Sequence, residues 1–159
     1  MSEQPWNPLD GERPELSINL HNGTDEQISI IIIHKDTPEY LNICLQSIAV
    51  TSFNNNYEII VVDNASGKDS QDYLMDIESE VKVIRNEKNL YWSATANKVS
   101  SAASKNSKYL VFMHCDVVIT NPAWLDLLIN ACETSKAGMV GVEMQGYWMQ
   151  NRKVDFIKE

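Results

Sequence analysis

The sequence predicts an α/β fold, with an open, mostly parallel sheet and helices on both of its faces. After Gln27, short runs rich in β-branched residues alternate with segments whose apolar residues recur at helical spacing. The strand-like runs also lack the polar alternation of a half-exposed sheet. Continuous apolar strands that are each followed by a helix are typical of parallel sheets buried on both faces.

The same alternation gives the expected elements. The expected strands are residues 28–33, 57–63, 81–84, 109–113 and 138–144. The expected helices are a segment that begins at Thr37, a segment that carries Leu74 and Ile77, residues 93–104, and a segment that begins at Asn121. Thr37 and Asn121 are each followed by a proline, which is favoured at the first helical position. No internal repeat or low-complexity tract competes with this organisation.

Composition and charge limit the classes of function that the protein can have. The length indicates one domain, with residues 1–27 as an extended or poorly ordered arm before a domain at residues 28–159. The 22 acidic and 13 basic residues give a net charge of -9, which disfavours nucleic acids and anionic lipids. The longest apolar runs are far short of the roughly 20 residues that span a bilayer, and the N-terminus lacks a signal pattern. Three widely spaced cysteines fit a reducing compartment, so we expect a cytoplasmic protein without a transmembrane segment.

Polar residues follow each of the first four expected strands. They are His34, Lys35 and Asp36; Asp63, Asn64 and Ser66; Arg85, Asn86 and Asn89; and His114, Cys115 and Asp116. Ligands of open parallel sheets bind beyond the carboxyl ends of the strands, which meet at one edge. For any single cluster a solvated loop is an equally good explanation, but four clusters at one edge favour a shared ligand site.

The chemistry of these residues narrows the ligand. The motifs G-x-G-x-x-G and G-x-x-x-x-G-K-[ST] are absent, which argues against nicotinamide enzymes and P-loop ATPases. Asp63 suits a hydrogen bond with a base or ribose, and Asp116 suits a hard cation. A divalent cation held by one or two protein groups completes its shell with water and substrate phosphates. A nucleoside diphosphate bridged to the protein by Mg or Mn would use both carboxylates.

Four segments carry a resemblance to a known family: "ISIIIIHKDTPEYLNICLQSI", "YEIIVVDNASGKDS", "VIRNEKNLYWSATANKVSSAA" and "YLVFMHCDVVITNPAWLDLLI". Their order and spacing resemble the nucleotide-sugar-binding half of family 2 glycosyltransferases, which have the GT-A fold, over about residues 28–142. The most specific parts are "VVDNAS" and the x-x-D strand end followed by "NPAWLDLL". The resemblance implies inverting, metal-assisted transfer of a sugar from a nucleotide-diphosphate donor, typically a UDP-sugar. The implied acceptor is a glycan or a lipid-linked molecule in cell-envelope polysaccharide synthesis.

The resemblance also implies roles for individual residues. It assigns the nucleotide to His34, Lys35, Asp36, Asp63, Asn64, Ser66, Asn89, Asn97 and His114. Within this set, Asp63 would accept a hydrogen bond from the base. Asp116 stands at the last position of the family's D-x-D motif, where a carboxylate ligates the Mn or Mg ion that bridges the diphosphate. His114 stands at the first position and is the second candidate ligand of this metal.

Three departures from the family pattern leave alternatives open. His114 replaces the first aspartate of D-x-D and lowers the negative charge offered to a hard cation. Tyr91 and Trp92 stand where the family has a glycine, and they either stack on a base or sugar or simply pack, with packing favoured for Trp92. The family's general base lies well beyond the metal motif, so we expect a domain truncated at its C-terminal side.

Two functions from different classes therefore remain. The first is a glycosyltransferase, which would rely on a protein partner or a homo-oligomer for acceptor binding if it is not simply truncated. The second is a non-catalytic nucleotide-sugar-binding or interaction remnant of the same fold. A zinc site that uses His114 and Cys115 is disfavoured, because successive residues of an extended segment point to opposite sides and no C-x-x-C partner exists. A catalytic Cys115 is disfavoured because no sequence evidence places a base against it.

Overall fold

The computed structural model describes residues 28–52 and 56–142, and the expected arm at residues 1–27 lies outside them. The strands are β1 (Ile28–His34), β2 (Tyr57–Asp63), β3 (Lys82–Arg85) and β4 (Tyr109–His114). The helices are α1 (Pro38–Thr51), α2 (Lys68–Ile77), α3 (Tyr91–Val99), the 3-10 helix η1 (Ser100–Ala102) and α4 (Trp124–Ser135). The strands form one parallel sheet in the order β3-β2-β1-β4. The predicted α/β class is confirmed.

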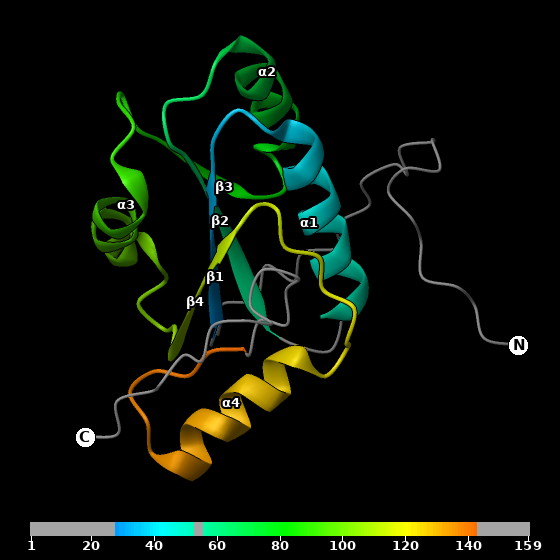
Figure 1. The fold of residues 1–159 in the computed structure, drawn as a ribbon, viewed down its shortest axis with the longest axis vertical. Helices are drawn as coiled ribbons and strands as arrows, with labels where there is room; N and C mark the ends of the chain where they lie inside the picture. Colours follow the sequence, from blue (N-terminus) through cyan, green and yellow to red (C-terminus); the bar gives the residue numbers. More distant parts are fainter. Residues whose placement is uncertain (1–27, 53–55, 143–159) are drawn as a thin grey trace, which may run out of the picture. The chain divides into compact units, whose positions relative to one another are not determined.

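Strand β1 lies between β2 and β4 and forms the centre of the sheet (Figure 1). Every residue of this strand is buried, and Ile30, Ile31 and Ile32 are fully buried. Burial of one such side chain contributes about 1.5–3 kcal/mol. The strand with the unbroken apolar run, β1, therefore lies where both of its faces and both of its edges are covered.

Helices cover both faces of the sheet, as predicted. Figure 1 shows α1 and α2 on one side of the strands and α3 on the other. On the α3 side, Ile31, Ile60 and Val62 of the sheet pack with Val99 of the helix. On the other side, α1 presents a fully buried apolar face made of Leu41, Cys44, Leu45 and Ile48.

Strand β4 is the edge of the sheet in the part of the chain that the structure describes. Its residues alternate in exposure, and Leu110 and Phe112 are 41% and 38% exposed while Met113 is buried. Phe112 is paired with Ile31, so it lies on the face that α3 covers elsewhere. The apolar cover of that face therefore ends between β1 and β4.

Several element boundaries differ from the sequence prediction. The third strand begins and ends one residue later than expected, at Lys82 and Arg85. The helix expected at residues 93–104 instead spans Tyr91–Val99 and then tightens into η1. The helix expected from Asn121 begins only at Trp124. Asn121 forms a turn first, because its side chain accepts a hydrogen bond from Ala123 N and its carbonyl accepts one from Trp124 N.

The fifth strand expected at residues 138–144 is wrong for the residues that the structure describes. Residues 138–142 form no strand, and residues 143–144 lie outside the described ranges. Met139 and Val142 are 88% and 72% exposed, so neither side chain gains burial from a sheet. A β-branched, apolar run needs a neighbouring strand as well as local propensity.

The chain divides into two compact units, one up to Leu125 and one from Asp126 onward. In the first unit, Trp124 is buried and its indole N–H donates to Ser52 Oγ at 2.8 Å. In the second unit, Cys132 is only half-buried, and its thiol bonds the carbonyl of Ala137 at 3.0 Å. Cys132 therefore does not belong to the fully buried core. Within the described ranges, no helix is both long and apolar enough to cross a bilayer.

Candidate functional site

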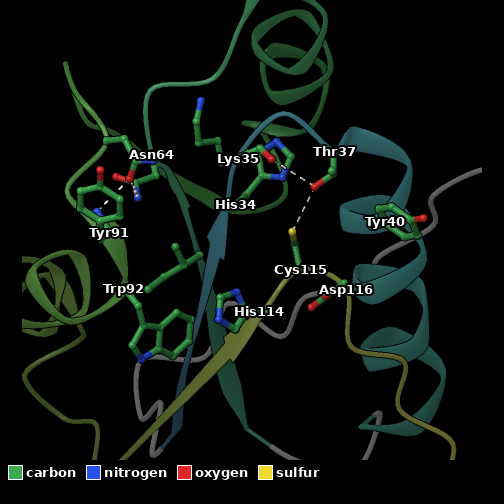
Figure 2. Close-up of a pocket in the computed structure, with 12 residues that line it drawn as sticks. His34, Lys35, Thr37, Tyr40, Asn64, Tyr91, Trp92, His114, Cys115 and Asp116 are labelled. Atoms are coloured by element: carbon green, nitrogen blue, oxygen red, sulfur yellow. Dashed lines mark hydrogen bonds between the residues drawn. The ribbon is translucent and has the colours of Figure 1, made fainter. Parts of the chain in front are cut away.

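A cavity of about 530 Å³ lies at the carboxyl edge of the sheet, within the first unit (Figure 2). It is lined by Ile33, His34, Lys35, Thr37, Tyr40, Asn64, Asn89, Tyr91, Trp92, His114, Cys115 and Asp116. These residues come from the ends of β1, β2 and β4, from the starts of α1 and α3, and from the loop between β3 and α3. Polar clusters after different strands thus meet at one edge, as the parallel topology predicts.

The structure brings together part of the predicted site. The predicted nucleotide and metal residues that line the cavity are His34, Lys35, Asn64, Asn89, His114 and Asp116. The predicted residues that do not line it are Asp36, Asp63, Ser66 and Asn97. Asn97 is exposed on α3, and its backbone carbonyl accepts a hydrogen bond from Ser100 Oγ. The functional roles assigned to these residues stay predictions.

The loops after β1 and β2 are tied together beside the cavity. Lys35 Nζ donates to Asp36 Oδ2 at 2.5 Å and to the carbonyl of Ala65 at 3.0 Å. Asp36 Oδ1 accepts from Gly67 N at 2.6 Å, and Asp36 N donates to Ser66 Oγ at 3.0 Å. These hydrogen bonds hold the pKa of Asp36 below its usual value, and the bond from Lys35 has a larger effect than the bond from Gly67. Asp36 therefore serves to anchor the Lys35 ammonium at the cavity.

Asp63 takes part in the turn that follows β2. Its side chain is 1% exposed, and its Oδ1 accepts a hydrogen bond from Ser66 N at 2.9 Å. The turn passes through Ala65, whose φ of 65° lies in the left-handed region. In this structure Asp63 thus supports the turn below the cavity, and its predicted hydrogen bond to a base stays a prediction.

Asn64 connects the end of β2 to the loop that precedes α3. Its Oδ1 accepts hydrogen bonds from Asn86 Nδ2, Leu90 N and Thr95 Oγ1 at 3.1, 3.0 and 3.2 Å. Its Nδ2 donates to Asn89 Oδ1 at 2.8 Å. Asn64 is 4% exposed, so these bonds form in a nearly dry environment. One side chain therefore fixes the loop that carries Asn89 to the cavity wall.

His34, the last residue of β1, is a fully buried polar group. Neither ring nitrogen has a hydrogen-bond partner among the described residues. Burial lowers the pKa of His34, although the nearby carboxylates of Asp63, Asp36 and Glu39 oppose this effect. The imidazole is therefore neutral near pH 7 and carries one N–H donor and one lone pair.

The end of β4 forms the other side of the cavity. The rings of His114 and Trp92 are stacked, with centroids 4.1 Å apart and an interplanar angle of 23°. Asp116 is exposed, and neither its carboxylate nor the His114 ring nitrogens hydrogen-bond another described residue. Cys115 is 7% exposed and its sulfur lies 3.3 Å from Thr37 Oγ1. In the described ranges, no group of three His, Cys, Asp or Glu side chains could hold a metal ion.

The sequence predicted the positions of the aromatic residues on the cavity wall less well than those of the polar residues. Tyr40 lines the cavity but was not among the predicted site residues. Its position in the first turn of the helix that follows β1 could have indicated that it lies at this edge of the sheet. Trp92 was expected to pack, and it does stack on His114, but it also lines the cavity. Tyr91 lines the cavity while remaining 79% exposed. Stacking on a ligand, left open for both aromatics in the sequence, is thus sterically available.

A comparison with protein families finds one match. The family model described as "Glycosyl transferase family 2" matches residues 29–155. Two curated relatives match as well. The O-antigen biosynthesis protein RfbC of Myxococcus xanthus is 24% identical over 122 residues, which are 74% of this chain and 9% of RfbC. An uncharacterized protein, y4gI, of Sinorhizobium fredii (strain NBRC 101917 / NGR234) is 28% identical over 121 residues, 74% of this chain and 13% of y4gI. The chain thus spans a small part of each relative.

Solved structures with the same fold include TarS of S. aureus. The 1-349 fragment of TarS superposes with a TM-score of 0.57 and 17% identity over 74% of this chain and 38% of the fragment. The same fragment in complex with UDP-GlcNAc gives a TM-score of 0.55 and 16% identity, over 74% and 37%. At these identities the likeness establishes the fold, which is that of the GT-A-like domain.

Proposed function

Because the chain belongs to glycosyl transferase family 2, we propose that its cavity binds a nucleotide-diphosphate sugar and that the protein transfers this sugar to an acceptor. A UDP-sugar is the proposed donor, since a structural neighbour has been solved with UDP-GlcNAc. A glycan or lipid-linked acceptor in cell-envelope polysaccharide synthesis is proposed, since one relative is an O-antigen biosynthesis protein. A cavity of about 530 Å³ is large enough for such a donor.

The observation that carries this proposal is the uncommitted carboxylate of Asp116 on the cavity wall. It has no hydrogen bond or ion pair with another described residue, and the His114 ring nitrogens beside it are equally available. One carboxylate and one imidazole fit a Mn or Mg ion that takes its remaining ligands from water and phosphate oxygens. Asp116 and His114 would hold this ion. When bound, the ion would neutralise negative charge that develops on the departing diphosphate.

Other side chains of the cavity suit the remaining parts of the donor. Lys35 is held at the edge by Asp36 and Ala65, and its positive charge favours a phosphate group. The neutral His34 and the amide of Asn89 present polar groups without net charge, which suits a nucleoside better than a second anion. In transfer with inversion, the acceptor oxygen forms a bond to the anomeric carbon as the bond to the diphosphate breaks. The acceptor proton passes to a base.

A second candidate function is binding of the nucleotide-sugar without transfer. Among the described residues that line the cavity, Asp116 is the one carboxylate. If Asp116 ligates the metal, the described residues that line the cavity include no separate carboxylate to accept the proton of the acceptor. This arrangement favours a domain that binds the donor without transferring the sugar.

Calorimetry with UDP tests the metal-assisted donor site. We expect UDP to bind the full chain more tightly in MnCl₂ than in EDTA, because Asp116 would hold a Mn²⁺ ion that neutralises charge on the diphosphate. The Asp116→Asn variant should lose this difference while keeping the metal-free affinity. Asp76→Asn on the exposed face of α2 is the matched control, and it should behave like the wild type. An undiminished Mn²⁺ effect in Asp116→Asn would remove Asp116 from the site, and a wild type that binds no UDP would overturn the proposed function.

A turnover assay separates the two candidate functions. Mn²⁺-dependent release of UDP from one member of a panel of UDP-sugars would support the transferase. Saturable binding of the same UDP-sugar without release of UDP would support the binding domain.

A further inference from the structure

The residue that opens α3 has an unusual backbone for its type. Tyr91 has a φ of 58°, in the left-handed region that glycine adopts easily and a bulky side chain adopts at a cost. Tyr91 also stands where the family pattern that the sequence resembles has a glycine. The chain therefore keeps the backbone conformation of a glycine and adds a phenol ring at this point.

The surroundings hold this conformation in place. Tyr91 N donates to Asn89 Oδ1 at 2.8 Å, and the preceding Leu90 N donates to Asn64 Oδ1 at 3.0 Å. Asn89 Oδ1 also accepts from Asn64 Nδ2 at 2.8 Å. The Asn64 and Asn89 side chains thus hold the backbone at Leu90 and Tyr91.

The Tyr91 ring takes no part in the packing or hydrogen bonding of the described residues. Tyr91 is 79% exposed, and its side chain has no hydrogen bond or ring contact with another described residue. It nevertheless lines the cavity, at the end formed by Asn64 and Asn89. Figure 2 shows Tyr91 beside Asn64 on one side of the cavity and Asp116 with Tyr40 on the other. A planar aromatic face is therefore offered to a ligand, away from the carboxylate proposed to hold the metal.

The adjacent amide adds a polar preference. Because two N–H donors bind Asn89 Oδ1, this oxygen is turned toward the loop. The Nδ2 group is thereby left as a donor without a partner among the described residues, and Asn89 lines the cavity next to Tyr91. A stacking ring beside an amide donor suits a flat heterocycle with an exocyclic carbonyl, as in uracil.

We propose that the Tyr91 ring stacks on the nucleobase of the donor and makes Tyr91 a specificity-determining residue. This inference rests on the proposed function, since it takes the ligand to be a nucleoside diphosphate with its diphosphate at the Asp116 side. Stacking of a base on an aromatic side chain corresponds to about a 5- to 150-fold contribution to affinity. The Tyr91 ring makes the larger part of the contact with the base. The amide donor of Asn89 favours bases that carry a carbonyl group.

Three variants of the full chain test the stacking. Tyr91→Asn removes the ring and tolerates positive φ, so the loop is retained. Tyr91→Phe keeps the ring without the hydroxyl. Met75→Ala, an exposed apolar residue on α2 away from the cavity, is the control. Measured by calorimetry in MnCl₂, UDP affinity should fall at least about fivefold in Tyr91→Asn and stay within about twofold in the other two.

A second readout reports on the position of the base rather than on affinity. The NMR signals of the uracil ring protons should shift upfield on binding to the wild type and to Tyr91→Phe, through the ring current. In Tyr91→Asn at saturating UDP this shift should be lost. Wild-type affinity or an unchanged shift in Tyr91→Asn would overturn the inference and leave the proposed function standing. Failure of the wild type to bind UDP would overturn both.

Discussion

At the scale of single residues, three of the four described non-glycine residues with positive φ lie in loops at the cavity. Asp36, Ala65 and Tyr91 have φ of 55°, 65° and 58°, and the fourth, Lys136 with a φ of 54°, follows α4 in the second unit. Each such residue costs about 1–2 kcal/mol and persists where its surroundings determine its conformation. Asp36 and Ala65 are held by the Lys35 contacts, and Tyr91 by the asparagines after β2 and β3. Three of the four strained positions therefore lie in the loops that form the proposed donor site.

Ala65→Gly should raise the free energy of unfolding by about 0.5–1 kcal/mol, because glycine adopts the φ of 65° without a Cβ penalty. Ala49→Gly, inside α1, is the control of opposite sign and should lower it by about 1 kcal/mol. Urea denaturation measures both values. A destabilised Ala65→Gly would show that the Ala65 backbone is not strained.

The buried imidazole of His34 predicts a dependence of stability on pH. Because burial lowers the pKa of His34 in the folded state below its ordinary value of 6.5, the unfolded chain binds a proton first as the pH falls. The contribution of the neutral His34 to the free energy of unfolding is complete above about pH 6.5 and is lost as the pH falls toward the pKa of His34 in the folded state. The slope is at most about 1.4 kcal/mol per pH unit.

His34→Asn should flatten this dependence between about pH 5 and pH 7, as measured by urea denaturation at each pH. Asp36, whose pKa is lowered from 3.8, contributes its own loss of stability only at more acidic pH. An equally steep dependence in His34→Asn would exclude His34 as its source.

At the scale of elements, the orientation of α3 depends on one buried amide. Asn64→Ala leaves Asn86 Nδ2, Leu90 N and Thr95 Oγ1 without their acceptor, and Asn86 and Thr95 are 5% and 0% exposed. We expect a loss of about 2–4 kcal/mol in the free energy of unfolding, because buried donors without partners carry their full desolvation cost. Thermal or urea denaturation measures it.

Two further variants refine this prediction. Asn64→Asp keeps the shared acceptor but loses the donation to Asn89 Oδ1, so its loss should be smaller than that of Asn64→Ala. Asn97→Ala, on the exposed face of α3, should change the stability by about 0.5 kcal/mol at most. Equal effects of Asn64→Ala and Asn97→Ala would contradict the role of Asn64.

At the scale of the whole molecule, the sequence predicts the sheet better than the site. The continuous apolar run of β1 suits the centre of a covered sheet, and together with the helical segments that follow each strand it predicted the fold class. The polar clusters at the strand ends met at one edge for the same topological reason. The Asn64 contacts and the Tyr91 backbone depend on loop conformation, which leaves no periodic signal. The fifth strand was predicted from local propensity, which does not provide a neighbouring strand.

The position of β1 between β2 and β4 has a consequence for folding. Ser29 Oγ and Ser107 Oγ are 2.5 Å apart although 78 residues separate them in the chain. Contacts of such long sequence separation close slowly, because the loop entropy is lost before the contact forms. Until β4 has been synthesised, one edge of an isoleucine-rich strand stays open to pairing with other chains. The order of synthesis thus makes a strand that is buried along its whole length in the folded protein an aggregation risk in the nascent one.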